Sequence, residues 1–81
     1  MAKVVFGSGL TRFTEGEAEV EIEAGRVRDL VDALQARYPG LKGVLDEMAV
    51  AIDGEVHNNP AYKSLRPDSE VHFLPKIGGG R

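Results

Sequence analysis

The sequence predicts an α+β fold in which a mixed sheet of four or five strands wraps around one main helix, with a short helix beside it. Over residues 18–24, apolar residues alternate with glutamates, which is the period of a half-buried strand. Over residues 27–38, apolar residues recur with the period of an amphipathic helix. Strand-like segments lie on both sides of this helix in the sequence, and a single long helix needs a sheet to cover its apolar face.

The first two strands are expected at residues 3–8 and 18–24, joined as a hairpin by a turn region. Residues 4–6 are β-branched or aromatic, as strands favour. The second strand places Glu19, Glu21 and Glu23 on one face. This regular spacing indicates a solvated strand surface and not a set of catalytic carboxylates.

The main helix is expected to begin after Gly25, which is a tolerable N-cap, and to end at Pro39-Gly40. A shorter apolar set follows and suggests one or two further helical turns packed on the core: Leu41, Val44, Leu45 and Met48. The apolar face of the main helix is formed by Val27, Leu30, Val31, Leu34 and Tyr38.

The second half of the chain contains two turn signals between strand-like segments. Asp53-Gly54 lies between residues 49–53 and 55–57 and suits a two-residue type I′ hairpin turn. Residues 66–69 form a second turn with proline at its second position. The last strand, residues 70–75, is expected beside the first strand and parallel to it. We therefore predict one domain over residues 1–76 and a flexible glycine-rich tail over residues 77–81.

The composition excludes several function classes. The chain has no cysteine, so it lacks disulfides, thiolate nucleophiles and thiolate metal sites. The net charge is −3 and the basic residues are scattered, which argues against nucleic acid as a partner. No apolar run has the length of a signal peptide or a membrane span, so we expect a cytoplasmic protein without a membrane partner.

Two further residue patterns carry no prediction of a site. His57 and His72 are the only histidines, and neither has a second histidine at ligand spacing, so we expect no metal site. Gly7-Ser8-Gly9 is too short for a phosphate-binding fingerprint. The chain itself is expected to bind no cofactor.

Several segments together resemble the β-grasp, ubiquitin-like sulfur carriers related to the molybdopterin synthase small subunit (MoaD) and the thiamine-pathway carrier (ThiS). The resemblance covers almost the whole chain, about residues 3–80, and its segments are specific in their order and spacing rather than singly. They are residues 27–34 (VRDLVDAL), 37–41 (RYPGL), 50–55 (VAIDGE) and 68–75 (DSEVHFLP), followed by the glycines.

The resemblance implies that the protein is a carrier and not itself an enzyme. Its working group is the carboxyl of Gly80, preceded by Gly79, which an E1-like adenylating enzyme activates with ATP. A persulfide sulfur then converts this carboxyl to a thiocarboxylate, which serves a sulfur-accepting biosynthetic enzyme. The family pattern ends in Gly-Gly, whereas Arg81 follows here. Some relatives carry residues beyond the diglycine that a metallopeptidase removes, and the resemblance implies the same for Arg81. A general carboxypeptidase that removes Arg81 is the alternative.

The residues before the acyl site are expected to bind the partner enzymes. Gly78 gives the tail the conformational freedom to thread a narrow channel. If the last strand alternates, Leu74 faces away from the core and can form an exposed apolar patch with Pro75 and Ile77. The alternative is that Leu74 only packs under a neighbouring loop.

Two other functions remain open at this point. The same glycine could be joined to lysines of target proteins, as in a ubiquitin-like protein modifier. The chain could also be a β-grasp interaction module with an inert tail, because glycine-rich ends are common and need no purpose. Nothing in the sequence selects between molybdopterin, thiamine, cysteine or another pathway as the recipient of sulfur.

Overall fold

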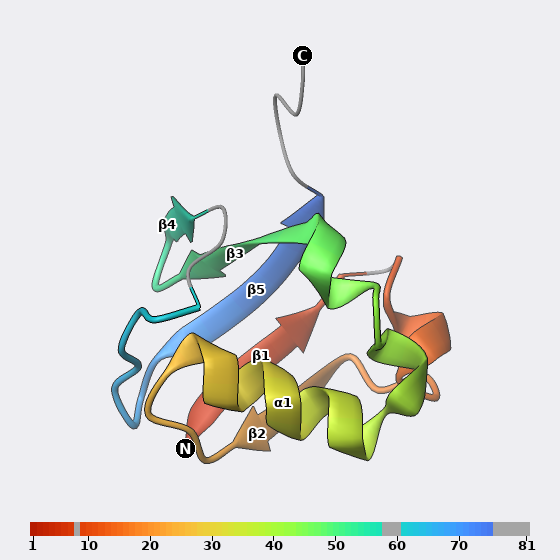
Figure 1. Ribbon diagram of the computed structural model, residues 1–81, viewed down its shortest axis with the longest axis horizontal. Coiled ribbons are helices and arrows are strands. Elements are labelled where there is room, and N and C mark those ends of the chain that lie inside the picture. The colour runs from red at the N-terminus through yellow and green to blue at the C-terminus, as the bar shows by residue number, and fades with distance from the viewer. Residues whose placement is uncertain (8, 58–60, 76–81) are drawn as a thin grey trace.

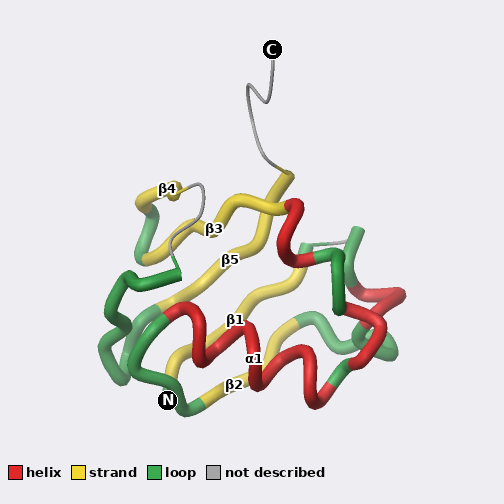
Figure 2. Tube along the Cα trace, viewed as in Figure 1, coloured by secondary structure: helices red, strands yellow, loops and turns green. Residues whose placement is uncertain are grey.

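The computed structural model describes residues 1–7, 9–57 and 61–75. Five strands form one sheet in the order β2-β1-β5-β3-β4, and α1 lies across one face of it (Figure 1). Figure 2 shows the same arrangement, with the helical segments on one side of the sheet. The elements are β1 (Ala2–Phe6), β2 (Glu19–Ile22), α1 (Val27–Arg37), β3 (Met48–Ile52), β4 (Glu55–His57) and β5 (Glu70–Pro75).

The sheet is mixed, as predicted, and β5 is its central strand. β5 runs parallel to β1 and antiparallel to β3, while β1 with β2 and β3 with β4 form antiparallel hairpins. The predicted pairing of the first and last strands is therefore confirmed, with Val4 beside Val71 and Phe6 beside Phe73. This pairing does not follow from the sequence alone, because β1 and β5 are neighbours in the sheet but lie at opposite ends of the chain.

The β3–β4 turn has the predicted conformation. Asp53 has a φ of 50° and Gly54 a φ of 88°, and a type I′ turn requires positive φ at both positions. The turn at residues 66–69 is also confirmed, because the Ser69 amide donates to the Arg66 carbonyl at 3.0 Å. Both turns lie next to the start of β5.

Helix α1 begins one residue later than the proposed cap at Gly25 implies. Arg26 is the N-cap, with an extended backbone and no side-chain capping bond. The first helical amides are satisfied by a neighbouring loop instead: Val27 donates to the Lys63 carbonyl and Arg28 to the Ala61 carbonyl, each at 3.0 Å. A tertiary contact therefore replaces the local cap, and this contact is not visible in the sequence.

The segment between α1 and β3 contains two short helical turns, as its apolar spacing predicts. The predicted short helix takes the form of two single 3₁₀ turns, Pro39–Leu41 and Leu45–Glu47. Gly43 lies between them with a φ of 82°, which interrupts any continuous helix. Met48, expected in this segment, is instead the first residue of β3.

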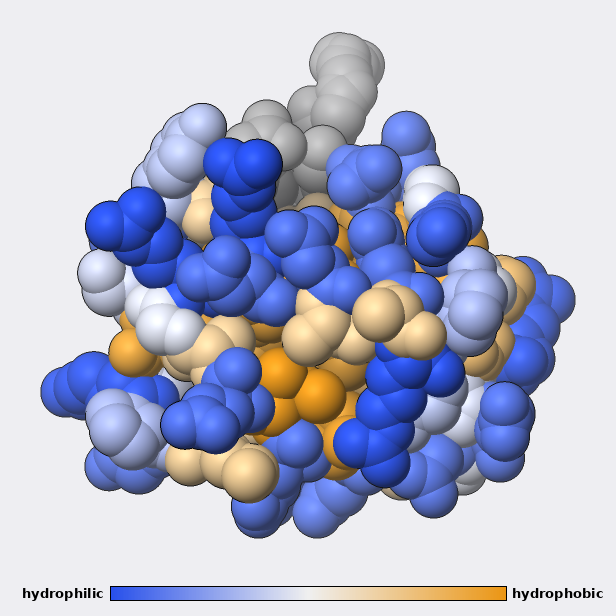
Figure 3. All heavy atoms as spheres, turned by 60° about the horizontal axis from the view of Figure 1, so that its bottom comes forward, coloured by the Kyte–Doolittle hydropathy of each residue, from blue (hydrophilic) through white to orange (hydrophobic). Residues whose placement is uncertain are grey.

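The core lies between the sheet and α1. Leu30 and Leu34 of α1 are fully buried and belong to one hydrophobic cluster with Val4 of β1 and Val71 of β5. Tyr38 closes the far end of the helix, where its ring packs edge-on to Phe6 and its hydroxyl donates to the Glu17 carboxylate at 3.3 Å. Figure 3 shows a surface on which hydrophilic side chains surround a smaller hydrophobic area. The hydrophobic core therefore contacts β5 on one face, through Val71 and Phe73.

Two sequence predictions concern membrane-spanning segments and the boundary between the domain and the tail. In the described ranges 1–7, 9–57 and 61–75, no helix combines the length and apolar character that crossing a bilayer requires. The predicted boundary between a domain of residues 1–76 and a tail of residues 77–81 lies outside the described residues, the last of which is Pro75.

Candidate functional site

The predicted site divides into a described and an undescribed part. Gly80 and Gly79, the proposed acyl site, lie outside the described residues together with Gly78 and Ile77. Leu74 and Pro75 are described as the last two residues of β5. The structure therefore places the base from which the tail starts.

This base pairs with β3, and the β1 pairing of β5 ends one residue before it, at Phe73. Leu74 pairs with Ala49 of β3, and Pro75 pairs with Met48, so the strand remains in register to its last residue. On the core side, Val71 is 0% and Phe73 4% exposed, which fixes the direction of the strand. A tail attached to a central strand with two hydrogen-bonded neighbours starts from a fixed point, and this is what precise delivery of its far end requires.

Leu74 lies on the sheet face opposite α1, as strand alternation predicts. It is half-buried and lines a shallow hollow of about 390 Å³ with Ala51, Gly54 and His72 among others. The side chain is therefore neither fully exposed nor fully buried. A partly open apolar side chain in a surface hollow suits a protein contact.

Leu74 is one member of a larger apolar surface, which we call the outer face. Strand register places its members next to one another, because directly paired residues share a face of the sheet. Val56, at the β4 edge, is 52% exposed, while Ala49 is fully buried. The accessible residues of the outer face are Val5, Ala51, Val56 and Leu74, with His72 between Val5 and Ala51, while Ala49 lies on the same side of the sheet but is buried.

Charged groups border the outer face. The His72 Nε2 and a Glu70 carboxylate oxygen are 2.9 Å apart, and Lys3 lies 3.6 Å from Glu19. His57 is similarly close to Glu55, at 3.2 Å. Each histidine thus has one carboxylate neighbour, and within the described part of the chain no three His, Asp or Glu side chains gather as a metal site would need.

Comparison with known proteins assigns the chain to a family. The ThiS family model matches residues 5–80. The chain belongs to the ThiS family. The molybdopterin synthase sulfur carrier subunit of Mycobacterium tuberculosis is 35% identical over 63 residues, which are 76% of this chain and 74% of that relative. The protein is therefore a member of a family of sulfur carriers, which act as substrates of other enzymes and not as catalysts.

Solved structures bear out the β-grasp, ubiquitin-like fold of this ThiS-family chain. A chain of the Amycolatopsis orientalis BexX/CysO complex matches with a TM-score of 0.85 and 21% identity, over 99% of this chain and 100% of that chain. Small archaeal modifier protein 1 from Methanosarcina acetivorans matches with a TM-score of 0.81 and 23% identity, over 98% and 95%. At these identities the likeness establishes the fold.

The sequence reasoning identified only part of the outer face of this ThiS-family protein. Leu74 was found through alternation, whereas Val5, Ala51 and Val56 were missed. A signal for them exists, because residues 4–6 and 48–52 are continuously apolar. Continuous apolar runs indicate strands with apolar side chains on both faces of the sheet. The second face of β1 and β3 is the outer face.

Proposed function

We propose that this protein carries sulfur on the carboxyl group of Gly80. An E1-like adenylating enzyme activates that carboxyl, a thiocarboxylate is formed, and a biosynthetic enzyme takes the sulfur. One observation carries this proposal most directly: the ThiS family model matches residues 5–80, a range that includes Gly78, Gly79 and Gly80 and does not include Arg81. The fixed base at Leu74 and Pro75 supports it.

The chemistry explains why a partner must supply the reactive groups. A carboxylate is a poor electrophile, so ATP first converts it to an acyl adenylate with AMP as leaving group. A persulfide sulfur of the partner system can then attack the acyl carbon and displace AMP, which gives an acyl disulfide. A second thiol of the partner system cleaves the S–S bond of this acyl disulfide, which releases the thiocarboxylate and leaves a disulfide on the partner. The chain has no cysteine, so the transferred sulfur must come from outside it. ATP is bound by the activating enzyme in this scheme, and the carrier holds no cofactor.

The glycines meet the steric requirement of the acceptor sites. The tail has to enter a narrow channel, where a Cβ atom would collide with the walls and where unusual backbone angles are needed. Gly78, Gly79 and Gly80 satisfy both conditions. Cleavage after Gly80, by a metallopeptidase or a carboxypeptidase, would precede activation because adenylation needs the glycine carboxyl itself.

We assign the docking of both partners to the outer face. It adjoins the base of the tail, and Leu74 belongs to both. The M. tuberculosis relative is named as a subunit of molybdopterin synthase, which supports a sulfur-accepting enzyme as one partner here. Because the activating step consumes ATP, we place the protein in the cytoplasm.

Mass spectrometry tests the proposal. The chain is incubated with its adenylating enzyme, ATP and a sulfur donor, before and after cleavage following Gly80. Conversion of the glycine carboxyl to a thiocarboxylate adds about 16 Da, and we expect it only in the cleaved chain. If the cleaved chain is never adenylated, the carrier function is wrong. Larger, lysine-linked products would instead identify the protein as a modifier.

A further inference from the structure

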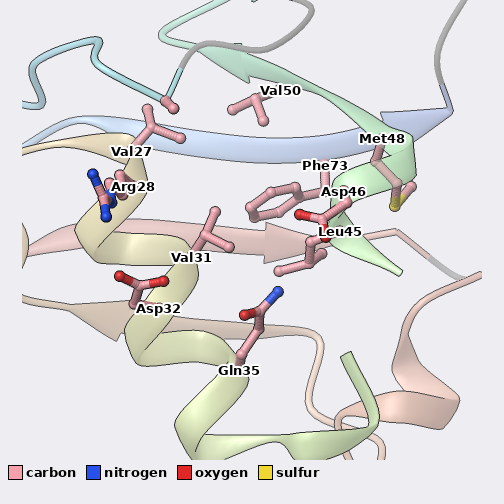
Figure 4. Close-up of a pocket in the computed structure, with 11 residues that line it drawn as sticks. Val27, Arg28, Val31, Asp32, Gln35, Leu45, Asp46, Met48, Val50 and Phe73 are labelled. Atoms are coloured by element: carbon pink, nitrogen blue, oxygen red, sulfur yellow. The ribbon is translucent and has the colours of Figure 1, made fainter. Parts of the chain in front are cut away.

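A groove lies on the helix side of the sheet, away from the outer face. It runs between α1 and β3 and encloses about 410 Å³ (Figure 4). Val50 and Phe73 of the sheet face into it from one side and Val31 of α1 from the other. Arg28, Asp32, Gln35 and Asp46 supply polar groups around this apolar interior.

The groove follows from the proportions of the fold. Five strands span roughly 19 Å from the first to the last, whereas an α-helix with its side chains is roughly 10 Å wide. One helix therefore cannot cover the whole sheet. α1 lies over β1 and β2 (Figure 1), away from β3, and the 3₁₀ turn at Leu45–Glu47 lies at the start of β3. An apolar strip beside α1 is left open.

The root of the tail lies at one end of this groove. Pro75 pairs with Met48, and Met48 lines the groove together with Leu45. In Figure 4, Met48 lies at the end of the groove nearest the end of β5, and Val27 and Arg28 lie at the other end. Residues 76–81 can reach about 20 Å, while the stretch of α1 along the groove is about 12 Å long. The tail is therefore long enough to follow the groove.

The composition of the tail matches the groove. Ile77 is the one large apolar residue among residues 76–81, and it follows Pro75 by two positions, which brings it within reach of Leu45 and Met48. Lys76 and Arg81 are cationic. The groove has a carboxylate near each of its ends. Asp46 lies near Met48, close to the root of the tail, and Asp32 lies one turn along α1 from Arg28, towards the other end.

We propose that the groove binds the protein's own tail before cleavage, with Ile77 against Leu45 and Met48 and Arg81 beside Asp32. The docked tail withholds Gly80 from partner enzymes, and loss of Arg81 weakens the docking and releases it. Three glycines lose much conformational freedom when ordered, so the contact is reversible. The outer face stays open to a partner meanwhile. The regulatory role rests on the proposed carrier function, whereas the docking itself does not.

The rate at which Arg81 is removed measures the docking. A carboxypeptidase specific for carboxyl-terminal basic residues acts only on the undocked tail, so its rate follows the undocked fraction. Intact mass is recorded with time for the 81-residue chain and for Asp32→Lys, which reverses the charge beside Arg81. We expect removal about three- to tenfold faster in Asp32→Lys. Equal rates in the two proteins would overturn the proposal.

Asp29→Lys is the matched control. Asp29 is exposed on the same helix but lines a different surface, near Ala24 and Leu65. It changes the charge of α1 equally and leaves the groove intact, so the wild-type rate is expected. If Asp29→Lys accelerates removal as much as Asp32→Lys does, the effect is one of general charge and the groove is not the site.

Nuclear magnetic resonance gives a second readout. Docking predicts contacts between the Ile77 methyl groups and those of Leu45 and Met48 in the full chain, lost in Ile77→Ser. Absence of these contacts in the wild type overturns the proposal. If the contacts of Ile77, or the protection of Arg81 from the carboxypeptidase, appear only at high protein concentration, the groove binds the tail of a second copy. This result would overturn intramolecular docking. Neither experiment involves adenylation, so a failure of the carrier function is seen separately.

Discussion

Leu74 combines two properties that suit a test of the outer face. Its backbone is fixed by pairing with Ala49, and its side chain is half-buried on the outer face without belonging to the core. A substitution there changes the surface more than the stability. This makes Leu74 the sharpest single test of the outer face as a docking surface.

We predict that Leu74→Asp weakens binding to the adenylating enzyme about tenfold or more, because a carboxylate would have to be buried in an apolar contact. The circular dichroism spectrum should remain native. Tyr62→Asp is the control: Tyr62 is 74% exposed, in the loop that bonds to the start of α1. Calorimetric titration of both variants checks the prediction, and wild-type affinity in Leu74→Asp would remove this residue from the interface.

Gly80 allows a test of the tail chemistry at a single carbon atom. In the chain cleaved after Gly80, Gly80→Ala should melt at the wild-type temperature and lose thiocarboxylate formation, because the added Cβ blocks the acceptor channel. Gly9→Ala is the matched control, since a Cβ at Gly9 meets no atom within 4 Å. Normal loading of the Gly80→Ala variant would show that the channel does not select glycine.

At the scale of elements, the β3–β4 turn is tied to the start of β5. The Glu70 amide donates to the Asp53 carboxylate at 2.9 Å, and the Asp53 amide donates to the Glu70 carbonyl at 2.9 Å. Arg66 lies 3.5 Å from the same carboxylate. The hydrogen bond from the Glu70 amide is the main reason why the pKa of Asp53 is lowered below its ordinary value.

This lowered pKa predicts a dependence of stability on pH. The folded state favours the ionised Asp53, so its contribution is complete above the pKa of the unfolded chain, near pH 4, and is lost as pH falls through the lower folded pKa. Urea unfolding should therefore show that Asp53→Asn is less stable than wild type at pH 7, and that the difference shrinks in acid.

Asp68→Asn separates this effect from general charge. Asp68 lies in the neighbouring turn, 4.0 Å from Arg66, and the structure gives it no bond to Glu70. Its effect on unfolding should be small at both pH values, as for most exposed ion pairs. A difference between wild type and Asp53→Asn that stays constant from pH 7 into acid would exclude the carboxylate as its source.

The elements differ in how far the sequence determines them. The turn at Asp53-Gly54 and the alternation in β2 were predictable, because both depend on neighbouring residues only. The N-cap at Arg26 was not, because carbonyls of Ala61 and Lys63 replace a side-chain cap. The outer face was found only at Leu74, since its other members become neighbours through strand register.

The chemistry of the tail stays a prediction, and it rests on a different kind of signal. The glycines and Arg81 are visible in the sequence, and their meaning came from the resemblance to sulfur carriers and not from any pattern of side chains. The groove beside α1 could not be foreseen. It depends on the width of the sheet relative to the helix and on the 3₁₀ form of Leu45–Glu47, which the apolar spacing did not indicate.

At the scale of the whole molecule, the sheet separates two tasks. Its helix side holds the core and the groove, and its outer face offers an apolar surface beside the root of the tail. β5 connects both, because Val71 and Phe73 face the core while Leu74 faces outward. Stability and function therefore depend on different residues of one strand.

This separation predicts that a core mutation lowers the stability of the protein, whereas a tail mutation lowers only the formation of the thiocarboxylate. Leu30 is fully buried, and Leu30→Ala should cost about 2–5 kcal/mol of stability through the cavity that it leaves. For a small domain this is a large part of the total free energy of unfolding. The yield of thiocarboxylate should then fall in proportion to the folded fraction, whereas Gly80→Ala loses the yield at full stability.

Urea unfolding and mass spectrometry on the same samples check this. In Leu30→Ala, the loaded fraction divided by the folded fraction should equal that of the wild type, since the folded molecules keep the register of β5 and hence the root of the tail. A loaded fraction that falls further than the folded fraction would mean that the core also sets the position of the tail. In that case the body of the protein would take part in the transfer itself, and the carrier would be more than a fixed base for a reactive end.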